Sequence, residues 1–511
     1  MRILGRRGRA RQRQHGTGTG SPGAGTVEAQ EAAGPKKDDK AGQPGDSPWK
    51  PSLADNLNLL RDALGSPATI DIQRLEVSGR NAALVCGRGL VDSQKIAVGV
   101  LAPLAEWSRA HPETRPALHD WQQGVLAAPQ LSMVHDLQEA ADQLFSGSVL
   151  LLLDGEPQVL AAPVDGFAKR QPSTPEVDPV IRGSREAMTE TLLDNLAMLR
   201  RTVPDRRLLI DMKRVGSRTH TRVAVVYLQD VADPDVVGEV HRRIDRVKTD
   251  GILESRYLEE RIQDSPWSPF PTLLDTERVD AVAQAVLQGQ VVVMLDRTPQ
   301  ALILPVTFFE FFRSMSDYSA PVYFATFLRW IRFLSFFLSF TLPSLYVALI
   351  GFQPEVIPTK LALSILGSRQ GIPFPAVFEV LILDIMMEVL REATVRMPRN
   401  VGQTIGVVGG IILGTAVVQA GIVSNIMVII VAMSAVASFA TANFTFSEAT
   451  RILKYALLVP TVLLGLVGYV GGLALLLLHL CSLESFGVPY TSPLAPYHPR
   501  DIKDTLARVP H

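Results

Sequence analysis

The chain has 511 residues, with 50 Lys and Arg against 51 Asp and Glu and a formal net charge of −1. This balance gives no reason to expect nucleic acid as a partner, and two distant cysteines, Cys86 and Cys481, argue against a disulfide framework. The length allows more than one domain, and almost all long apolar runs follow Thr326.

The first 50 residues are rich in arginine and then in glycine and proline, and no apolar segment follows the arginines. A secretory signal peptide needs such a segment. We therefore interpret residues 1–50 as a disordered basic tail that stays solvated.

Two copies of one sequence pattern follow between Trp49 and Phe312. Asp55-Asn56-Leu57 reappears as Asp194-Asn195-Leu196, and the run DGEPQ at 154–158 returns as DRTPQ at 296–300. The offset between matching positions drifts smoothly, so we predict a domain duplication whose period is too long for a solenoid. The predicted boundaries are 51–165 for the first soluble subdomain, 166–183 for a linker and 184–315 for the second.

Each copy shows leucines at helical spacing and short β-branched runs, which favours an α/β or α+β fold for both subdomains. Asp154 and Asp296 recur before a proline, and we interpret them as turn-forming residues rather than catalytic ones. No metalloprotease, CxxC, hydrolase or phosphate-loop motif is present in the sequence. We therefore predict no enzyme, no metal site and no cofactor.

The apolar runs within residues 326–483 predict a helical membrane domain with four to six membrane helices. Its first apolar run, 333–352, suits one span, and Arg329 and Arg332 before it favour the cytoplasmic side for the soluble half. A proline-punctuated connector follows. It is predicted to lie at the membrane interface or to re-enter rather than to cross.

Residues 376–392 are apolar enough for a buried helix yet carry five charged side chains, namely Glu379, Asp384, Glu388, Arg391 and Glu392. All except Glu379 fall on one face of a helix. Acidic groups at membrane depth are typical of ion pathways, whereas an interfacial helix or buried ion pairs would explain the same pattern. We favour the ion path and keep both interpretations open.

Residues 400–447 contain no Lys, Arg, Asp or Glu. As one helix they would reach about 72 Å, against a bilayer core of about 30 Å, so we predict two spans joined by a turn at 421–425. Glycines recur at every fourth position on one stripe and are predicted to pack helices closely: Gly402, Gly406, Gly410 and Gly414.

Glu448, Arg451 and Lys454 separate these spans from a last apolar run, residues 455–483. The polar tail 484–511 is predicted to be partly ordered. Five crossings would place it outside and four inside, and the sequence leaves this open.

Several long segments resemble the A subunit of the GerA family of spore germinant receptors. They include SREAMTETLLDNLAMLRR at 184–201, DGILESRYLEERIQDSPWSPFPT at 250–272, and CSLESFGVPYTSPLAP at 481–496. A further match runs through residues 342–414. The resemblance extends from about residue 50 to the C-terminus, with departures at Thr415-Ala416 and at 440–443, where a proline break is usual.

The resemblance implies a multi-pass protein of the spore inner membrane whose soluble half faces the spore core. Its implied partners are a permease-like B subunit, a lipoprotein C subunit, membrane lipid and further copies of the chain, as a homo-oligomer that is a pentamer. The implied activity is a nutrient-gated cation channel that triggers germination. The alternatives are an auxiliary ion channel of the stage V sporulation protein AF type, a secondary transporter, which usually carries inverted repeats, and a membrane-anchored enzyme.

Overall fold

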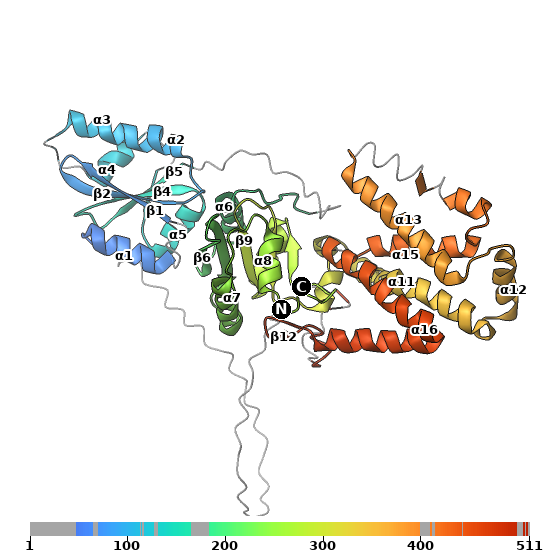
Figure 1. Ribbon diagram of the computed structural model, residues 1–511. Coiled ribbons are helices and arrows are strands. Elements are labelled where there is room, and N and C mark those ends of the chain that lie inside the picture. Colours follow the sequence, from blue (N-terminus) through green and yellow to red (C-terminus); the bar gives the residue numbers. More distant parts are fainter. Residues whose placement is uncertain are drawn as a thin grey trace, which may run out of the picture. The chain divides into compact units, whose positions relative to one another are not determined.

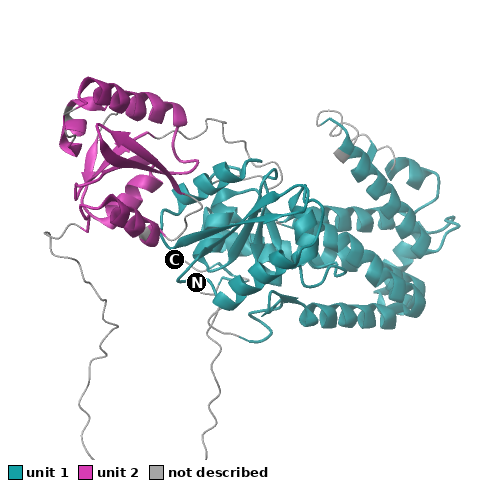
Figure 2. Cartoon of the chain, turned by 60° about the vertical axis from the view of Figure 1, so that its left-hand side comes forward, with its two compact units in different colours: residues 1–2, 65–69, 167–511 teal, residues 3–64, 70–166 magenta. Residues whose placement is uncertain are grey.

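The computed structural model describes residues 48–64, 70–112, 114, 117–126, 131–164, 183–398, 409–410, 414–441, 443–497, 504–505 and 507–508. These residues fall into two compact units (Figure 2), one built from the first soluble subdomain and the other from the second subdomain together with the helical region. The tail 1–47 and most of the linker lie outside the described residues, so their predicted character stays a prediction.

The unit that contains the first soluble subdomain, magenta in Figure 2, is a five-stranded antiparallel sheet with helices on both faces (Figure 1). Its strand order is β1-β2-β4-β5-β3, and the central strand β4 is buried along its whole length. The elements are α1 (Leu53–Leu64), β1 (Ile70–Val77), β2 (Arg80–Gly87), α2 (Ser93–Ile96), η2 (Ala97–Leu101), α3 (Ala102–Ala110), α4 (Leu118–Asp120), η3 (Trp121–Val125), β3 (Ser132–Val134), α5 (Leu137–Phe145), β4 (Ser148–Leu153) and β5 (Val159–Pro163).

The second subdomain has a sheet of the same order, β6-β7-β9-β10-β8, again with every pairing antiparallel. The equal order is what the repeated sequence pattern predicts. Its elements are α6 (Leu192–Thr202), β6 (Leu208–Val215), β7 (Thr221–Leu228), α7 (Pro234–Arg246), α8 (Ser255–Ile262), β8 (Leu274–Thr276), α9 (Val279–Leu287), β9 (Val291–Leu295) and β10 (Ala301–Leu304).

The repeated Asp and Asn residues form equivalent hydrogen bonds in the two copies. Asp154 accepts a hydrogen bond from the backbone N–H of Leu53 at 3.0 Å, and Asp296 accepts one from Leu192 at 3.2 Å, so each carboxylate holds the first turn of its own subdomain's first helix. Asn56 and Asn195 each exchange two hydrogen bonds with the backbone of the residue six positions earlier. The turn-forming interpretation of both Asp residues agrees with this geometry.

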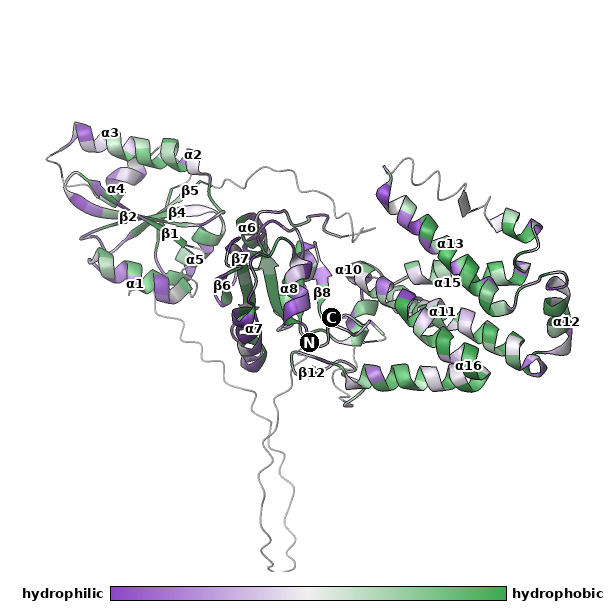
Figure 3. Cartoon of the chain, in the orientation of Figure 1, coloured by the Kyte–Doolittle hydropathy of each residue, from purple (hydrophilic) through white to green (hydrophobic). Residues whose placement is uncertain are grey.

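The helical region follows a phenylalanine-rich segment. Among the residues that the structure describes, two helices are long and apolar enough to cross a membrane, α11 and α16, and Figure 3 colours both largely hydrophobic. The elements are η4 (Phe308–Phe312), α10 (Met315–Tyr318), α11 (Val322–Phe352), η5 (Pro354–Val356), α12 (Thr359–Ser368), α13 (Ala376–Arg396), α15 (Asn425–Phe439), α16 (Phe444–Ser482), β11 (Glu484–Ser485) and β12 (Val488–Pro489).

Both long helices start earlier than their apolar runs. Helix α11 begins at Val322 rather than at residue 333, so Arg329 and Arg332 lie within it. Helix α16 begins at Phe444 rather than at residue 455, because the side chain of Asn443 accepts a hydrogen bond from the N–H of Phe446 and caps the helix. The turn predicted at 421–425 is confirmed: α15 starts at Asn425, and Gly421 has a φ of 66°.

Helix α16 reverses its direction at Gly465, whose φ of 61° and ψ of −136° are not helical. The last apolar run, residues 455–483, therefore contributes to two helical arms that meet at Gly465. The two arms pack closely, since a Cβ at Gly468 would overlap the carbonyl of Pro460. The second arm returns to the second subdomain, where Leu480 joins the same core as Phe446.

The described part of the tail packs on the second subdomain. Ser485 donates to the carbonyl of Thr272 at 2.7 Å, and the hydroxyl of Tyr490 donates to that of Pro271 at 2.7 Å. Burial raises the pKa of Tyr490 well above its ordinary value. The described part of the tail and the second subdomain therefore lie at the same end of the helical region. The number of crossings and the side of the membrane stay predictions.

Candidate functional site

The charged residues of α13 meet the first arm of α16. Asp384 is 1% exposed and accepts a hydrogen bond of 2.8 Å from Nζ of Lys454, which is itself buried. One turn along α13, Glu388 accepts from Nε of Arg451 at 3.1 Å and from its Nη2. Two carboxylates of one helix are thus each held by a cation of the other.

Arg391 and Glu392 belong to the end of the same helix but differ in setting. Nη1 of Arg391 lies 3.8 Å from Glu388, and its guanidinium stacks over the ring of Phe439 at 4.7 Å. Glu392 pairs with Arg396 of its own helix at 2.6 Å, with both side chains more than half exposed. Arg391 therefore joins the end of α13 to the end of α15, whereas Glu392 remains at the surface.

Glu379 faces away from these pairs, as the helical spacing predicts. It is fully buried, accepts a hydrogen bond from the N–H of Ser424 at 2.8 Å, and lies 3.1 Å from Nη2 of Arg369. Ser424 is the N-cap of α15, so this carboxylate joins the start of α13 to the turn before α15.

A buried ion pair contributes little net stability, but removing one member leaves an uncompensated charge and costs about 3–5 kcal/mol. Oδ2 of Asp384 is buried and has no hydrogen-bond partner among the described residues. Separating Asp384 from Lys454 would therefore leave both charges without a partner in a buried setting, whereas Glu388 and Arg451 are partly exposed.

The predicted glycine stripe, which consists of Gly402, Gly406, Gly410 and Gly414, is only partly described. Gly402 and Gly406 lie outside the described residues, and Gly410 and Gly414 would meet no atom within 4 Å if a Cβ were added. At Gly410 and Gly414, therefore, no described atom packs against the glycine stripe. The helix packing predicted for this stripe stays a proposal. In the helical region, a Cβ would make close contacts at Gly409 with Leu390 of α13, at Gly465 with Phe352 of α11, and between the arms of α16 at Gly468 and Gly472.

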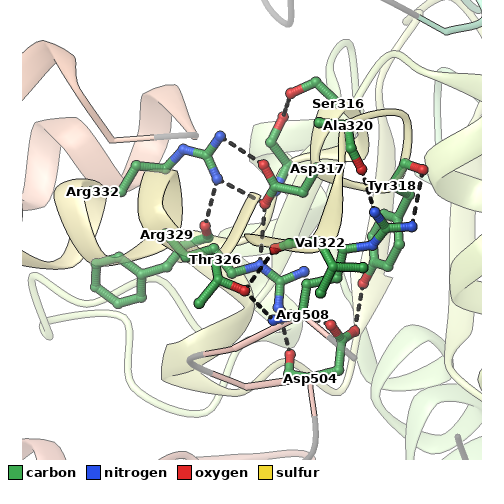
Figure 4. Close-up of polar contacts among 12 residues, drawn as sticks. Ser316, Asp317, Tyr318, Ala320, Val322, Thr326, Arg329, Arg332, Asp504 and Arg508 are labelled. Atoms are coloured by element: carbon green, nitrogen blue, oxygen red, sulfur yellow. Dashed lines mark hydrogen bonds and ion pairs between the residues drawn. The ribbon is translucent and has the colours of Figure 1, made fainter. Parts of the chain in front are cut away.

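A buried charge network joins α10, α11 and the C-terminal tail, and the sequence analysis missed it (Figure 4). Asp317 is fully buried and accepts from Nε of Arg329 at 3.2 Å and from both terminal nitrogens of Arg332 at 2.8 Å. The two arginines that the sequence assigned to the membrane flank are thus committed to a protein carboxylate.

The tail completes this network through Asp504 and Arg508. Asp504 lies 2.9 Å from Nη1 of Arg329 and accepts from the hydroxyl of Tyr318 at 2.7 Å. Arg508 donates to the carbonyls of Tyr318 and Ala320. Burial raises the pKa of Tyr318, and the neighbouring Asp504 acts in the same direction. The only local signal was the capping box at Ser314 and Asp317, because the partners are nearly 190 residues apart.

Within the described residues, no group of three or more His, Cys, Asp or Glu is placed to hold a metal ion. Cys86 is buried and Cys481 exposed, and both are free thiols. Burial raises the pKa of the Cys86 thiol to about 11, so it is an unreactive side chain at neutral pH.

The chain is similar to curated spore germination proteins over most of its length. The family profile described as Bacillus/Clostridium GerA spore germination protein matches residues 58–511. Spore germination protein KA of Bacillus subtilis (strain 168) is 38% identical over 467 residues, covering 90% of this chain and 85% of that protein. Spore germination protein B1 of the same strain is 36% identical over 460 residues, covering 90% and 95%.

Two further comparisons are with a membrane protein and a solved structure. The uncharacterized membrane protein YfkQ of Bacillus subtilis (strain 168) is 35% identical and covers 91% of this chain and 90% of its own length. The crystal structure of the N-terminal domain of the A subunit of the Bacillus megaterium spore germinant receptor GerK3 is 29% identical, with a TM-score of 0.41, and covers 51% of this chain and 97% of that one. On the strength of the family profile and the curated sequences, the chain belongs to the GerA family of spore germination proteins.

Proposed function

We propose that this chain is the A subunit of a nutrient germinant receptor in the spore inner membrane, and that copies of it assemble into a cation-conducting ring. Membership of the GerA family supports the receptor assignment. The observation that carries the channel assignment is the pair of carboxylates Asp384 and Glu388, held among apolar helices by cations of α16. Ionisable groups in such a setting are typical of ion pathways.

The chain's contacts favour six membrane traverses. Gly465 lies against Phe352, so the reversal of α16 sits at the far end of α11 from the soluble subdomain. The start of α13 meets the start of α15 through Glu379, and the end of α13 meets the end of α15 where Arg391 stacks on Phe439. Because the start of α13 lies by the start of α15 and the two ends also meet, the chain has to cross once more between these helices. With α11, α13, α15 and the two arms of α16, this gives six crossings. An even number agrees with the position of the tail.

We assign the described arrangement to a closed state. Asp384 and Glu388 are occupied by Lys454 and Arg451, so a passing cation would find both carboxylates neutralised. Moving the first arm of α16 relative to α13 would free both groups at once. Nutrient binding to the complex would drive that movement. The proposed partners are a permease-like B subunit and a lipoprotein C subunit. The A subunit itself is proposed to form a homo-oligomer, a pentamer as in the resemblance to the GerA family.

The test is cation flux through the purified full chain, reconstituted with its partners in liposomes. Asp384→Asn combined with Glu388→Gln is expected to change the rate of cation flux or the selectivity between cations. Glu448→Gln is the matched control, because this exposed carboxylate lies on the same arm of α16. Unchanged flux and selectivity in the double variant, with normal assembly, would remove both carboxylates from the ion path.

An auxiliary channel of the stage V sporulation protein AF type is the second candidate. Spore germination proteins KA and B1 of Bacillus subtilis (strain 168) and GerLA and GerQA of Bacillus cereus are named as spore germination proteins, which favours the receptor. Neighbouring genes for a ten-span permease and a lipoprotein would support the receptor assignment.

A further inference from the structure

The loop before β8 carries the most exposed large apolar side chain of the described residues. Trp267 is 98% exposed, whereas Phe270, three residues later, is buried in the core that the second subdomain shares with the long helices. A single exposed apolar residue needs no explanation by itself. The position of this one relative to the apolar helices is what points to a partner.

The loop 264–272 is held at both ends, so its tryptophan has a fixed place. Asp264 at the start of the loop pairs with Arg243 at 2.5 Å. The carbonyl of Pro271 near its end accepts a hydrogen bond from the hydroxyl of Tyr490 at 2.7 Å. Prolines at positions 266 and 269 restrict the backbone on both sides of the tryptophan.

The residue after Trp267 contacts the end of the second arm of α16, which returns to β12 beside the second subdomain (Figure 1). Oγ of Ser268 lies 2.9 Å from Nε2 of His479. Residues 466–482 form this arm and include no Lys, Arg, Asp or Glu. At 1.5 Å per residue the arm is about 26 Å long, close to the ~30 Å of a bilayer core. His479 and the neighbouring Trp267 therefore lie where a bilayer crossed by this arm changes from acyl chains to headgroups.

Helix α11 gives a second measure of the same level. Its apolar run begins at residue 333, and Trp330, one turn earlier, is 50% exposed. The side chains of Thr341 in α11 and Tyr469 in the second arm form a hydrogen bond. The two helices run in opposite directions. Counting ten residues from this contact toward the second subdomain reaches His479 on the arm and the residue after Trp330 on α11.

We propose that Trp267 and Trp330 anchor the second subdomain in the lipid headgroup layer of the membrane. The inference rests on the membrane location in the proposed function. An indole joins a large apolar ring to one N–H donor, and tryptophan is enriched at this boundary for that reason. The two side chains come from different elements and lie at one depth. A bilayer surface covers both by its geometry, whereas a partner protein has no need to follow that depth.

Depth-dependent fluorescence quenching tests the proposal on the purified full chain in phosphatidylcholine nanodiscs. One set of nanodiscs carries a spin-labelled lipid with its label near the headgroups, and a second set carries the label deep in the acyl chains. Acrylamide quenches from the water. The variants are Trp267→Phe and Trp330→Phe. Trp121→Phe is the matched control, because Trp121 is fully buried in the core of the first subdomain.

We expect the headgroup label to quench the wild type more strongly than the deep label. Trp267→Phe and Trp330→Phe should each remove about half of the lipid-quenched fluorescence, and Trp121→Phe should leave it unchanged. Lipid-quenched fluorescence that is unchanged in either anchor variant overturns the proposal. Quenching of Trp267 by acrylamide alone would place it in water, and protection from every quencher would place it under a second copy or another protein.

Leu475→Trp distinguishes failure of the anchor from failure of the proposed function. Leu475 is 66% exposed near the middle of the second arm, so an indole introduced there is quenched by the deep label if the arm crosses the bilayer. Quenching at position 475 without lipid quenching of Trp267 contradicts the anchor alone. No lipid quenching at position 475 contradicts the membrane location and the anchor with it.

Discussion

Asp384 illustrates how single residues act in this chain. Its carboxylate is buried between two helices and accepts a hydrogen bond from Lys454, 70 residues away. The sequence showed a carboxylate on an apolar helix but not which cation would meet it, because α16 was expected to begin after Lys454. The Asp384–Lys454 pair was therefore not predictable, because apolar patterning alone placed the start of α16 after Lys454.

Replacing Lys454 with Met leaves the Asp384 charge buried and unpaired, and should destabilise the protein by about 3–5 kcal/mol. Arg396→Met breaks only the exposed pair with Glu392 and should change stability by less than about 1 kcal/mol. Unfolding of the full chain in detergent measures both. Equal losses in the two variants would contradict the burial argument.

Glu259 offers a pH-dependent contribution in the soluble part. Burial raises the pKa of this carboxyl from 4.5 to about 7, although Arg256 opposes the shift. The folded state therefore binds the proton more tightly than the unfolded state. Stability from this group is present below pH 4.5 and declines as the pH rises through about 7, by roughly 3 kcal/mol.

Glu259→Gln should remove that decline, so the variant gains stability relative to wild type between pH 5 and pH 8. Melting temperatures of the full chain at the two pH values provide the measurement. Glu310, whose pKa burial also raises, is present in both proteins and cancels in the difference. An identical pH dependence in the two proteins would show that Glu259 titrates normally.

At the scale of elements, the sheets were more predictable than the helical region. Leucine spacing, β-branched runs and the repeated turns predicted an α/β or α+β arrangement in both copies, since these signals are local. The reversal of α16 was hidden because hydropathy carries no direction: residues on both sides of Gly465 are equally apolar. The buried network around Asp317 was hidden for a different reason, as Asp504 meets it only after folding.

Gly468 and Gly471 provide a matched test of the reversal. A Cβ at Gly468 would collide with the carbonyl of Pro460, whereas one at Gly471 would meet nothing within 4 Å. Both changes to alanine bring the same gain in helix propensity, about 1 kcal/mol. We expect Gly468→Ala to lower the thermal midpoint and Gly471→Ala to leave it unchanged or raise it. The opposite order would mean that the arms do not pack as described.

At the scale of the whole molecule, the second subdomain, the long helices and the tail share one hydrophobic core. Phe308, Phe336 and Phe446 bring the subdomain and the two long helices into contact, with ring centroids of Phe336 and Phe446 4.9 Å apart. Movement of the helices is therefore coupled to the second sheet, which gives the soluble half a physical route to the proposed ion path.

The glycine stripe concerns contacts between copies of the chain, because Gly410 and Gly414 would meet no described atom within 4 Å if a Cβ were added. If it packs one copy against another, Gly410→Leu and Gly414→Leu should abolish the oligomer and leave the monomer folded. Gly238→Leu, on the exposed face of α7, is the control. Size-exclusion chromatography with light scattering distinguishes these outcomes, and wild-type oligomers from both variants of the glycine stripe would refute the assignment.

The central claim is that this chain is a receptor subunit whose helices conduct cations, and spores test it most directly. Cation release after addition of single nutrients is recorded from spores with the gene intact, with the gene deleted, and with the Asp384→Asn/Glu388→Gln variant restored. The account predicts that deletion abolishes release in response to one nutrient class and that the variant alters its rate. A wild-type response of the deletion spores to every nutrient would contradict it.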